Sequence, residues 1–381
     1  MNLSTKEVAK PVFFPNLNGL RFLAASMVIV SHIEQHLDWF NIKSSSLVAV
    51  HEIGKKGVSL FFVLSGFLIT YLLLQEKATT QTISLKNFYL KRIYRIWPLY
   101  YLVVISAFFI LPHFHFFNLP GVSENLSNDF NIRFVLFLFI LPNVSQILYP
   151  FLPFGSQLWS IGVEEQFYII WPLIIKISKK VLTSILVFIA GLPLIIIFIT
   201  QIIKIFFHTA GITNTILLFA KNYLTITSID LMAMGALASL LLIKKHKWLT
   251  FIYHPITQYF VLAILILFFG TNAYLPMFNN IMYGIPIAIF ILNLASNPAV
   301  IINLKNPVLD YLGKISYGIY MYHLLGIFIS LKCLIYMGLK LDQFAGKSLL
   351  YICSFSLTIA IAAVSFRIIE TPILKLKHRL H

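Results

Sequence analysis

The sequence has few charged residues for its length. Only 11% of its 381 residues are Asp, Glu, Lys or Arg, whereas 59% are hydrophobic. A soluble domain of this size needs more polar surface, so the composition excludes that class and predicts a polytopic membrane protein. Acidic residues are especially scarce, 13 against 29 Lys and Arg. In a membrane protein such an excess usually orients the spans in the bilayer, so we expect no nucleic acid partner.

Cysteine is also scarce, and no soluble segment interrupts the chain. Cys333 and Cys353 form no CxxC motif or zinc-site spacing, which excludes a disulfide framework and leaves no metal site to expect. The polar N-terminus leads straight into a long apolar stretch, so a cleavable signal peptide is not expected. Without a linker, a repeat or a low-complexity tract, we assign residues 1–381 to a single transmembrane domain.

Apolar stretches predict about ten membrane-spanning helices. We expect them over residues 17–38, 57–75, 97–117, 158–176, 183–205, 223–243, 257–272, 280–296, 315–332 and 348–368. An even number places both termini on one side. With the termini in the cytoplasm, the inner segments hold about twice as many Lys and Arg as the outer ones, which favours that orientation. The predicted fold is an all-α bundle with both termini cytoplasmic.

One apolar segment does not fit this pattern. The core of residues 132–149 before Pro142 is too short for an ordinary span. We expect it to form a re-entrant or outer-leaflet segment within a long outer loop, residues 118–157.

The first span contains ionisable residues that a lipid-facing helix would avoid. Arg21 is near its start, and His32, Glu34 and His36 are towards its end. An ionisable group in a membrane is costly and commonly marks a functional site. Arg21 and His32 would be roughly 16 Å apart along the helix axis at 1.5 Å per residue. One helix could therefore hold a cation near one membrane face and an imidazole beyond the midplane.

The fourth span contains two adjacent carboxylates, Glu164 and Glu165. Glu165 is six residues beyond Trp159, and His32 is six residues before Asp38, so we expect Glu165 and His32 at similar depth. A carboxylate beside an imidazole would orient it as a general base. Neighbouring helical residues diverge by about 100°, so only one of the two glutamates would face the first span. Alternatively, both are in the outer interface, solvated or capping.

Four further residues stand out. Arg92 and Arg95 are three residues apart on one helix face at the cytoplasmic end of the third span, where they could bind phosphate oxygens. Alternatively, they only orient the span in the membrane, as basic residues at a cytoplasmic helix end commonly do. Asp230 is within the sixth span. His323 is within the ninth, either as a packed core residue or as part of a site.

Several motifs together resemble a known family. In chain order they are NGLRFLAASMVIVSH, GVSLFFVLSGFLIT, FYLKRIYRIWPLY, LWSIGVEEQFYIIWP, LGKISYGIYMYH and RIIETP. This ordered set, from about residue 14 to 375, resembles the acyltransferase-3 family of bacterial integral membrane proteins. The resemblance implies transfer of an acyl group, usually acetyl, from cytoplasmic acyl-CoA to a hydroxyl of a cell-envelope glycan or lipid-linked sugar. It also implies a location in the bacterial inner membrane.

The resemblance also suggests roles by position. His32 would be the catalytic base, oriented by Glu165 or Glu164. The phosphates of acetyl-CoA would bind the three arginines, Arg21, Arg92 and Arg95. Asp230 lacks the arginine that commonly precedes it in the family, and His323 is followed by two leucines where relatives often have Trp-Pro. Their roles stay open.

These assignments predict a mechanism and leave alternatives. His32 would take the proton of an acceptor hydroxyl, which attacks the thioester; an acyl-imidazole intermediate is the other route. We expect no soluble esterase-like domain after the spans, and we favour lipopolysaccharide O-antigen or a similar surface sugar as the acceptor. A transporter or exporter of a glycan intermediate is the alternative function, because it too would need polar residues in mid-membrane.

Overall fold

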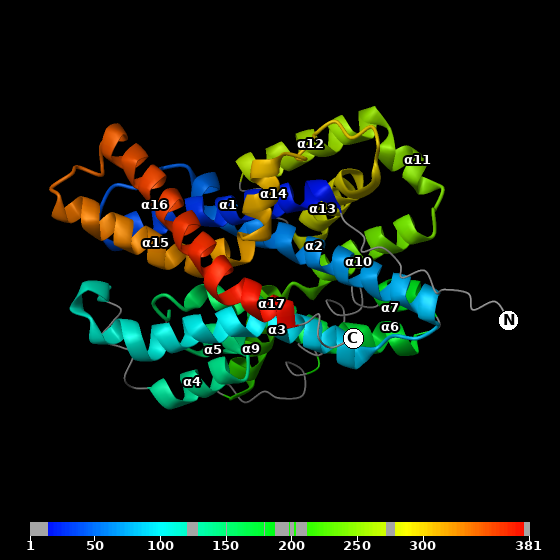
Figure 1. Cartoon of the computed structure of the whole chain (residues 1–381), viewed down its shortest axis with the longest axis horizontal. Helices are drawn as coiled ribbons and strands as arrows, with labels where there is room; N and C mark the ends of the chain where they lie inside the picture. Colours follow the sequence, from blue (N-terminus) through cyan, green and yellow to red (C-terminus); the bar gives the residue numbers. More distant parts are fainter. Residues whose placement is uncertain are drawn as a thin grey trace.

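The structure is a computed structural model. It describes residues 14–119, 129–149, 151–178, 180–186, 212–271 and 279–376, together with positions 198 and 202. Its regular elements in these ranges are all helices, so the all-α prediction is confirmed for them. Most of the larger helices extend along the long axis of the molecule (Figure 1).

Several described helices suit a membrane. Four are long and apolar enough to cross one: α2 (Val48–Thr80), α3 with its continuation (Leu85–His113), α15 (Ser316–Tyr336) and α16 with its continuation (Phe344–Leu376). Three shorter helices are also apolar: α10 (Ile229–Ile243), α12 (Pro255–Gly270) and α13 (Asn279–Ser296). The chain is therefore a multi-pass membrane protein. The count of ten spans and the sidedness of the termini stay predictions, because most of the expected span 183–205 is outside the described residues.

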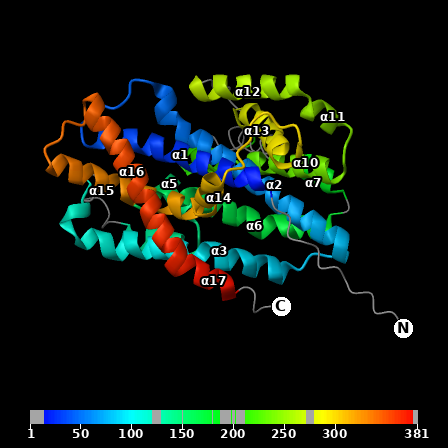
Figure 2. The ribbon, with the colours of Figure 1, turned by 45° about the horizontal axis from the view of Figure 1, so that its top comes forward.

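The remaining described helices complete the bundle. Helix α1 (Pro15–Trp39) carries Arg21 and His32, and α6 (Trp159–Ile177) carries Glu164 and Glu165. The shorter ones are α4 (Phe130–Leu138), α5 (Pro142–Leu148), α7 (Val181–Leu186), α9 (Ile212–Thr227), α11 (Trp248–Tyr253), α14 (Pro307–Lys314) and α17 (Thr371–Leu376). Figures 1 and 2 show α15 and α16, in orange and red, as a helical hairpin at one end of the long axis.

The structure changes some expected boundaries. The expected span 223–243 consists of two helices, α9 and α10, which meet at Ser228 with a left-handed φ of 39°. Segment 132–149 forms the short helices α4 and α5, separated by a turn in which Ile140 has φ of 57°. Pro142 begins α5, as proline favours the first turn of a helix. The segment therefore contains no single spanning helix.

Helix α2 is the central packing element, and α1 packs antiparallel to it. A Cβ added at Gly57 would lie 2.5 Å from the carbonyl oxygen of Ala24, so the two backbones are in close contact there. The ring of Phe14 lies 5.7 Å from that of Phe67. The start of α1 therefore lies beside the second half of α2, which puts Arg21 beside the middle of α2.

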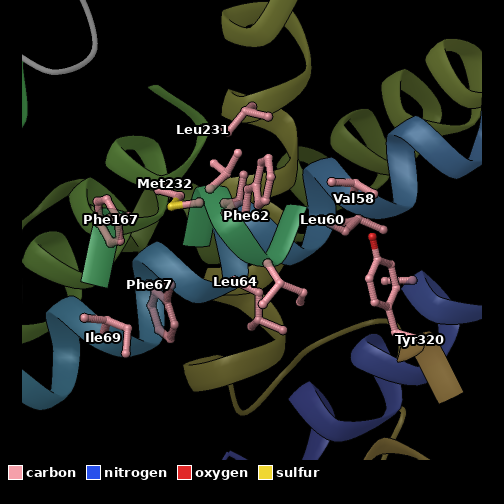
Figure 3. Close-up of a cluster of buried hydrophobic side chains, with 14 of the residues drawn as sticks. Val58, Leu60, Phe62, Leu64, Phe67, Ile69, Phe167, Leu231, Met232 and Tyr320 are labelled. Carbon is pink, nitrogen blue, oxygen red and sulfur yellow. The ribbon is translucent and has the colours of Figure 1, made fainter. Parts of the chain in front are cut away.

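Glycines also set the spacing between α2 and α10. A Cβ at Gly66 would overlap the carbonyl oxygen of Met232, and one at Gly235 would overlap that of Val63. Small residues allow this close approach of membrane helices. Figure 3 shows apolar side chains packed at this junction, including Phe62, Leu231 and Met232.

Helix α6 begins inside the bundle. Gln157, just before it, is 3% exposed and donates at 2.9 Å to the carbonyl oxygen of Met321, the sixth residue of α15. A Cβ at Gly162 would lie 2.8 Å from the ring of Pro142, so α5 packs over the first turns of α6. Trp159 therefore does not mark the membrane surface. The expectation that Glu165 and His32 lie at similar depth assumed that it does.

Replacing Gly66 with Ala should destabilise the protein, because the new methyl group must push the α10 backbone away. Overpacking of this kind costs about 1–3 kcal/mol. We expect a lower melting temperature for the purified protein in detergent. Gly270→Ala is the matched control, since a Cβ at Gly270 meets nothing within 4 Å. Equal melting temperatures for Gly66→Ala and the wild type would contradict the close α2–α10 contact.

Candidate active site

A cavity lies between α1, α2, α3, α6 and α15. The cavity and its mouth contain about 760 Å³ of empty space. The polar side chains that line it come from segments far apart in the sequence: Arg21, Ser65, Arg92, Arg95, Ser160, Glu164, Tyr168, Ser316, Tyr317 and Tyr320. We call it the inner cavity.

A second cavity adjoins the first at the arginines. It contains about 610 Å³ of empty space and is lined by Phe14, Leu17, Asn18, Arg21, Leu68, Leu72, Arg92 and Arg95. We call it the second cavity. Arg21, Arg92 and Arg95 line both, so the three guanidinium groups gather where the cavities meet. The structure thus brings together the three arginines that the sequence suggested as a phosphate site.

Arg21 and Arg92 have neutral hydrogen-bond and ring partners. Arg21 Nη1 donates to Asn18 Oδ1 at 2.9 Å. The Arg92 guanidinium lies over the rings of Phe88 and Tyr168, at 5.6 and 5.4 Å from their centroids. In the described part of the chain, none of the three arginines forms an ion pair. Their donors are therefore available to an anionic ligand such as a phosphate.

An ion pair on the protein surface orients Arg21 through Asn18. Asn18 donates its amide to Asp310 Oδ1 at 2.7 Å, and Asp310 also pairs with Lys314 within α14 at 2.5 Å. The hydrogen bonds from Lys314 and Asn18 lower the pKa of Asp310 below its ordinary value. Asp310 therefore stays ionised at neutral pH and anchors the amide that orients Arg21.

The two glutamates face different neighbours. Glu164 lines the inner cavity and accepts from Ser65 Oγ and from the Tyr168 hydroxyl, both at 3.0 Å. Glu165 is buried and accepts from Trp97 Nε1 at 3.1 Å. Only Glu164 therefore belongs to the cavity with the arginines.

His32 has partners other than the expected carboxylates. Its Nδ1 lies 2.9 Å from the carbonyl oxygen of Val28 and 3.2 Å from Nε2 of His323. Neither Glu164 nor Glu165 is among its hydrogen-bond partners in the described chain. The expected His–Glu contact is wrong because α6 begins inside the bundle, so Glu164 shares a cavity with Arg21 and is not paired with His32.

One end of the inner cavity is close to the histidines, although neither of them lines it. At this end it is lined by Tyr320, whose hydroxyl is 2.6 Å from Ser160 Oγ and whose carbonyl oxygen is 2.5 Å from Nδ1 of His323. His32 itself is half-buried. Tyr320 thus lies between the cavity that the arginines line and the two histidines.

Asp230 is separate from this site. It is in the first turn of α10, where it accepts from its neighbour's backbone, Leu231 N, at 3.1 Å and from Asn280 Nδ2 at 2.9 Å. It lines neither cavity. These contacts favour a structural role in joining α10 to α13.

Sequence reasoning missed several cavity residues. Tyr168 is four residues after Glu164, so helical spacing could have placed both on one face. Ser65 and Tyr317 come from other helices, and nothing near them in the sequence indicates Glu164 or the arginines as neighbours. Arg367 and Glu370 are three residues apart but form no ion pair among the described residues. Both are in a π-helical turn, whose wider spacing changes which residues face each other.

No group of three or more His, Cys, Asp or Glu residues suited to a metal ion occurs in the described ranges.

One family model matches most of the chain. Residues 14–367 match the acyltransferase-3 family, described as an acyltransferase domain. Since the match covers most of the chain, this multi-pass protein belongs to that family. No solved structure matches the chain.

Individual relatives are O-acetyltransferases by name. The chain is 33% identical to a peptidoglycan O-acetyltransferase of Listeria monocytogenes, over 44% of this chain and 25% of the relative. It is 27% identical to a candidate O-acetyltransferase of Staphylococcus aureus, over 95% of this chain and 58% of the relative. It is also 27% identical to a candidate peptidoglycan O-acetyltransferase of Bacillus subtilis, over 95% of this chain and 55% of the relative. The matches thus cover between a quarter and somewhat over half of the length of these relatives.

The adjacent glutamates allow a paired test. Glu164→Gln should lower acyl transfer about tenfold or more, because it removes the charge next to the arginines and leaves one amide oxygen where two carboxylate oxygens accepted from Ser65 and Tyr168; hydrogen bonds to charged groups contribute about 1.5–3 kcal/mol. Glu165→Gln retains an acceptor for Trp97 and should have a smaller effect. The measurement is acylated product formed by equal amounts of each purified variant. A larger loss for Glu165→Gln would contradict the assignment of Glu164 to the cavity.

Proposed function

We propose that this protein is a membrane O-acetyltransferase of a bacterial inner membrane. It takes acetyl groups from acetyl-CoA on the cytoplasmic side and transfers them to a hydroxyl of a cell-envelope glycan. The observation that supports the proposal is the cluster of three arginines, which line two cavities and form no ion pair among the described residues. One of these cavities is also lined by Tyr320, whose carbonyl oxygen contacts His323.

The arginine cluster suits the donor. Acetyl-CoA has several phosphate groups, and guanidinium groups bind phosphate oxygens through paired hydrogen bonds. The α2–α3 turn near these arginines is flanked by Lys77, Lys86 and Lys91. Basic residues of this kind are typical of the cytoplasmic side, where acetyl-CoA is found. With the phosphates at the cluster, the pantetheine arm would follow the inner cavity towards Tyr320.

His32 suits the role of general base. A carbonyl oxygen can only accept, so the contact with Val28 places the proton of neutral His32 on Nδ1 and the lone pair on Nε2. Nε2 of His32 has no hydrogen-bond partner among the described residues. This nitrogen can take the proton of an acceptor hydroxyl as the oxygen attacks the thioester carbon. Attack by Nε2 itself, through an acyl-imidazole, uses the same nitrogen.

The names of the relatives favour a particular acceptor. Two of them are named for peptidoglycan. This supports a peptidoglycan sugar as the acceptor and gives no support to lipopolysaccharide O-antigen, which the sequence alone suggested. A lipid-linked precursor of the glycan is the form that a membrane enzyme could reach directly.

Changing Arg92 and Arg95 together to Gln should raise the dissociation constant for acetyl-CoA at least about tenfold, because each charge-assisted hydrogen bond contributes about 1.5–3 kcal/mol. Binding to the purified protein can be measured by isothermal titration calorimetry. Lys91→Gln is the control, since Lys91 is exposed and lines neither cavity. Unchanged affinity in the double variant would reject the donor site.

His32→Ala should lower acetyl transfer by about 10²–10⁴-fold, the usual contribution of a general base, with no change in acetyl-CoA affinity. The assay combines purified protein, acetyl-CoA and peptidoglycan fragments, with released CoA thiol and acetylated glycan as readouts. Full activity of the variant would reject the role of His32. Glycan movement across vesicles without any release of CoA would instead support a transporter.

A further inference from the structure

A second buried histidine, His323, lies directly against His32. It is on α15 and its side chain is 0% exposed. The two ring centroids are 4.8 Å apart, and the ring planes are inclined at 53°. Nε2 of His323 is 3.2 Å from Nδ1 of His32, and Nδ1 of His323 is 2.5 Å from the carbonyl oxygen of Tyr320. Both nitrogens of His323 are therefore engaged.

These contacts determine where the protons are. The Tyr320 carbonyl oxygen can only accept, so Nδ1 of His323 carries a proton. In the neutral ring the lone pair is then on Nε2, which faces His32. Nε2 of His323 can therefore only accept from His32 Nδ1–H.

The proton on His32 Nδ1 has two acceptors, the carbonyl oxygen of Val28 and Nε2 of His323. If the proton moved to Nε2 of His32, three lone pairs would face one another with no proton between them. The surroundings of Nδ1 therefore favour a single tautomer, in which Nε2 of His32 is the basic nitrogen. His323 also prevents the ring of His32 from turning towards α15.

We propose that His323 is a positioning residue for His32, an inference that rests on the proposed transferase function. His323 holds the ring and tautomer of His32 and stabilises the imidazolium by accepting its Nδ1–H. This is the task that an aspartate performs in the Ser-His-Asp arrangement. It replaces the carboxylate that the sequence suggested, because Glu164 and Glu165 are bound to other partners.

The transfer step balances with His323 in this role. Nε2 of His32 takes the proton of the acceptor hydroxyl while the oxygen forms a bond to the thioester carbonyl carbon. The carbon–sulfur bond then breaks, and the CoA sulfur leaves with the proton held on Nε2. The proton on Nδ1 stays between His32 and His323 throughout, so His323 ends the cycle unchanged.

Two substitutions of His323 separate positioning from packing. An Asn side chain reaches only the level of Nδ1, so His323→Asn can bind the Tyr320 carbonyl but cannot contact His32. Gln is longer, and its oxygen can replace Nε2 as the acceptor. We expect kcat to fall about 10- to 100-fold in His323→Asn, the usual effect of losing such a supporting group, and to be largely retained in His323→Gln. KM for acetyl-CoA should be unchanged in both, because the arginines are intact.

His36→Asn is the matched control. His36 is also buried on α1 and its Nδ1 lies 2.6 Å from a backbone carbonyl, that of His32, but its ring packs on Trp39. Its kcat should equal that of the wild type. Melting temperatures of all variants identify any loss of folding.

The outcomes distinguish this inference from the function on which it rests. Wild-type kcat in folded His323→Asn, with His32→Ala inactive, would reject the positioning role alone. Equal losses of kcat and of melting temperature in the Asn and Gln variants would show that His323 only packs. A wild-type protein that releases no CoA thiol with any glycan acceptor would reject the proposed function, and this inference with it.

Discussion

The placement of positive charge inside the bundle is the constraint on which the rest of the structure depends. A guanidinium group at membrane depth is costly unless it is paired or faces a polar cavity. Arg21, Arg92 and Arg95 satisfy this requirement by gathering where two cavities meet, with an amide and aromatic faces as their neighbours. The absence of ion pairs among the described residues leaves their charge for an anionic ligand.

Close helix packing places the other groups around this charge. Gly66 and Gly235 bring α2 against α10, and Ser65, the neighbour of Gly66, then reaches Glu164 on α6. The start of α6 inside the bundle puts Ser160 beside Tyr320, one helical turn from His323. The arginines and Tyr320 thereby line one cavity, and the carbonyl oxygen of Tyr320 contacts His323. The proposed transfer from a donor at the arginines to an acceptor at His32 needs this order.

Sequence reasoning predicted the local features of this site better than its three-dimensional contacts. The helical class, the ionisable groups in α1 and the shared face of Arg92 and Arg95 follow from composition and spacing. The partner of His32 does not follow from them. The depth of Glu165 was counted from Trp159, as if α6 began at the membrane surface. Only the tertiary contact of Gln157 with α15 reveals that it begins deeper. The pairing of His32 with His323, 291 residues apart, has no local signal.

The most direct test of the central claim is a structure of the protein with bound acetyl-CoA, determined by cryo-electron microscopy in lipid nanodiscs. The account predicts phosphate density between the guanidinium groups of Arg21, Arg92 and Arg95, with the thioester extending along the inner cavity towards Tyr320. Phosphates bound elsewhere on the protein, with lipid tails filling both cavities, would contradict it.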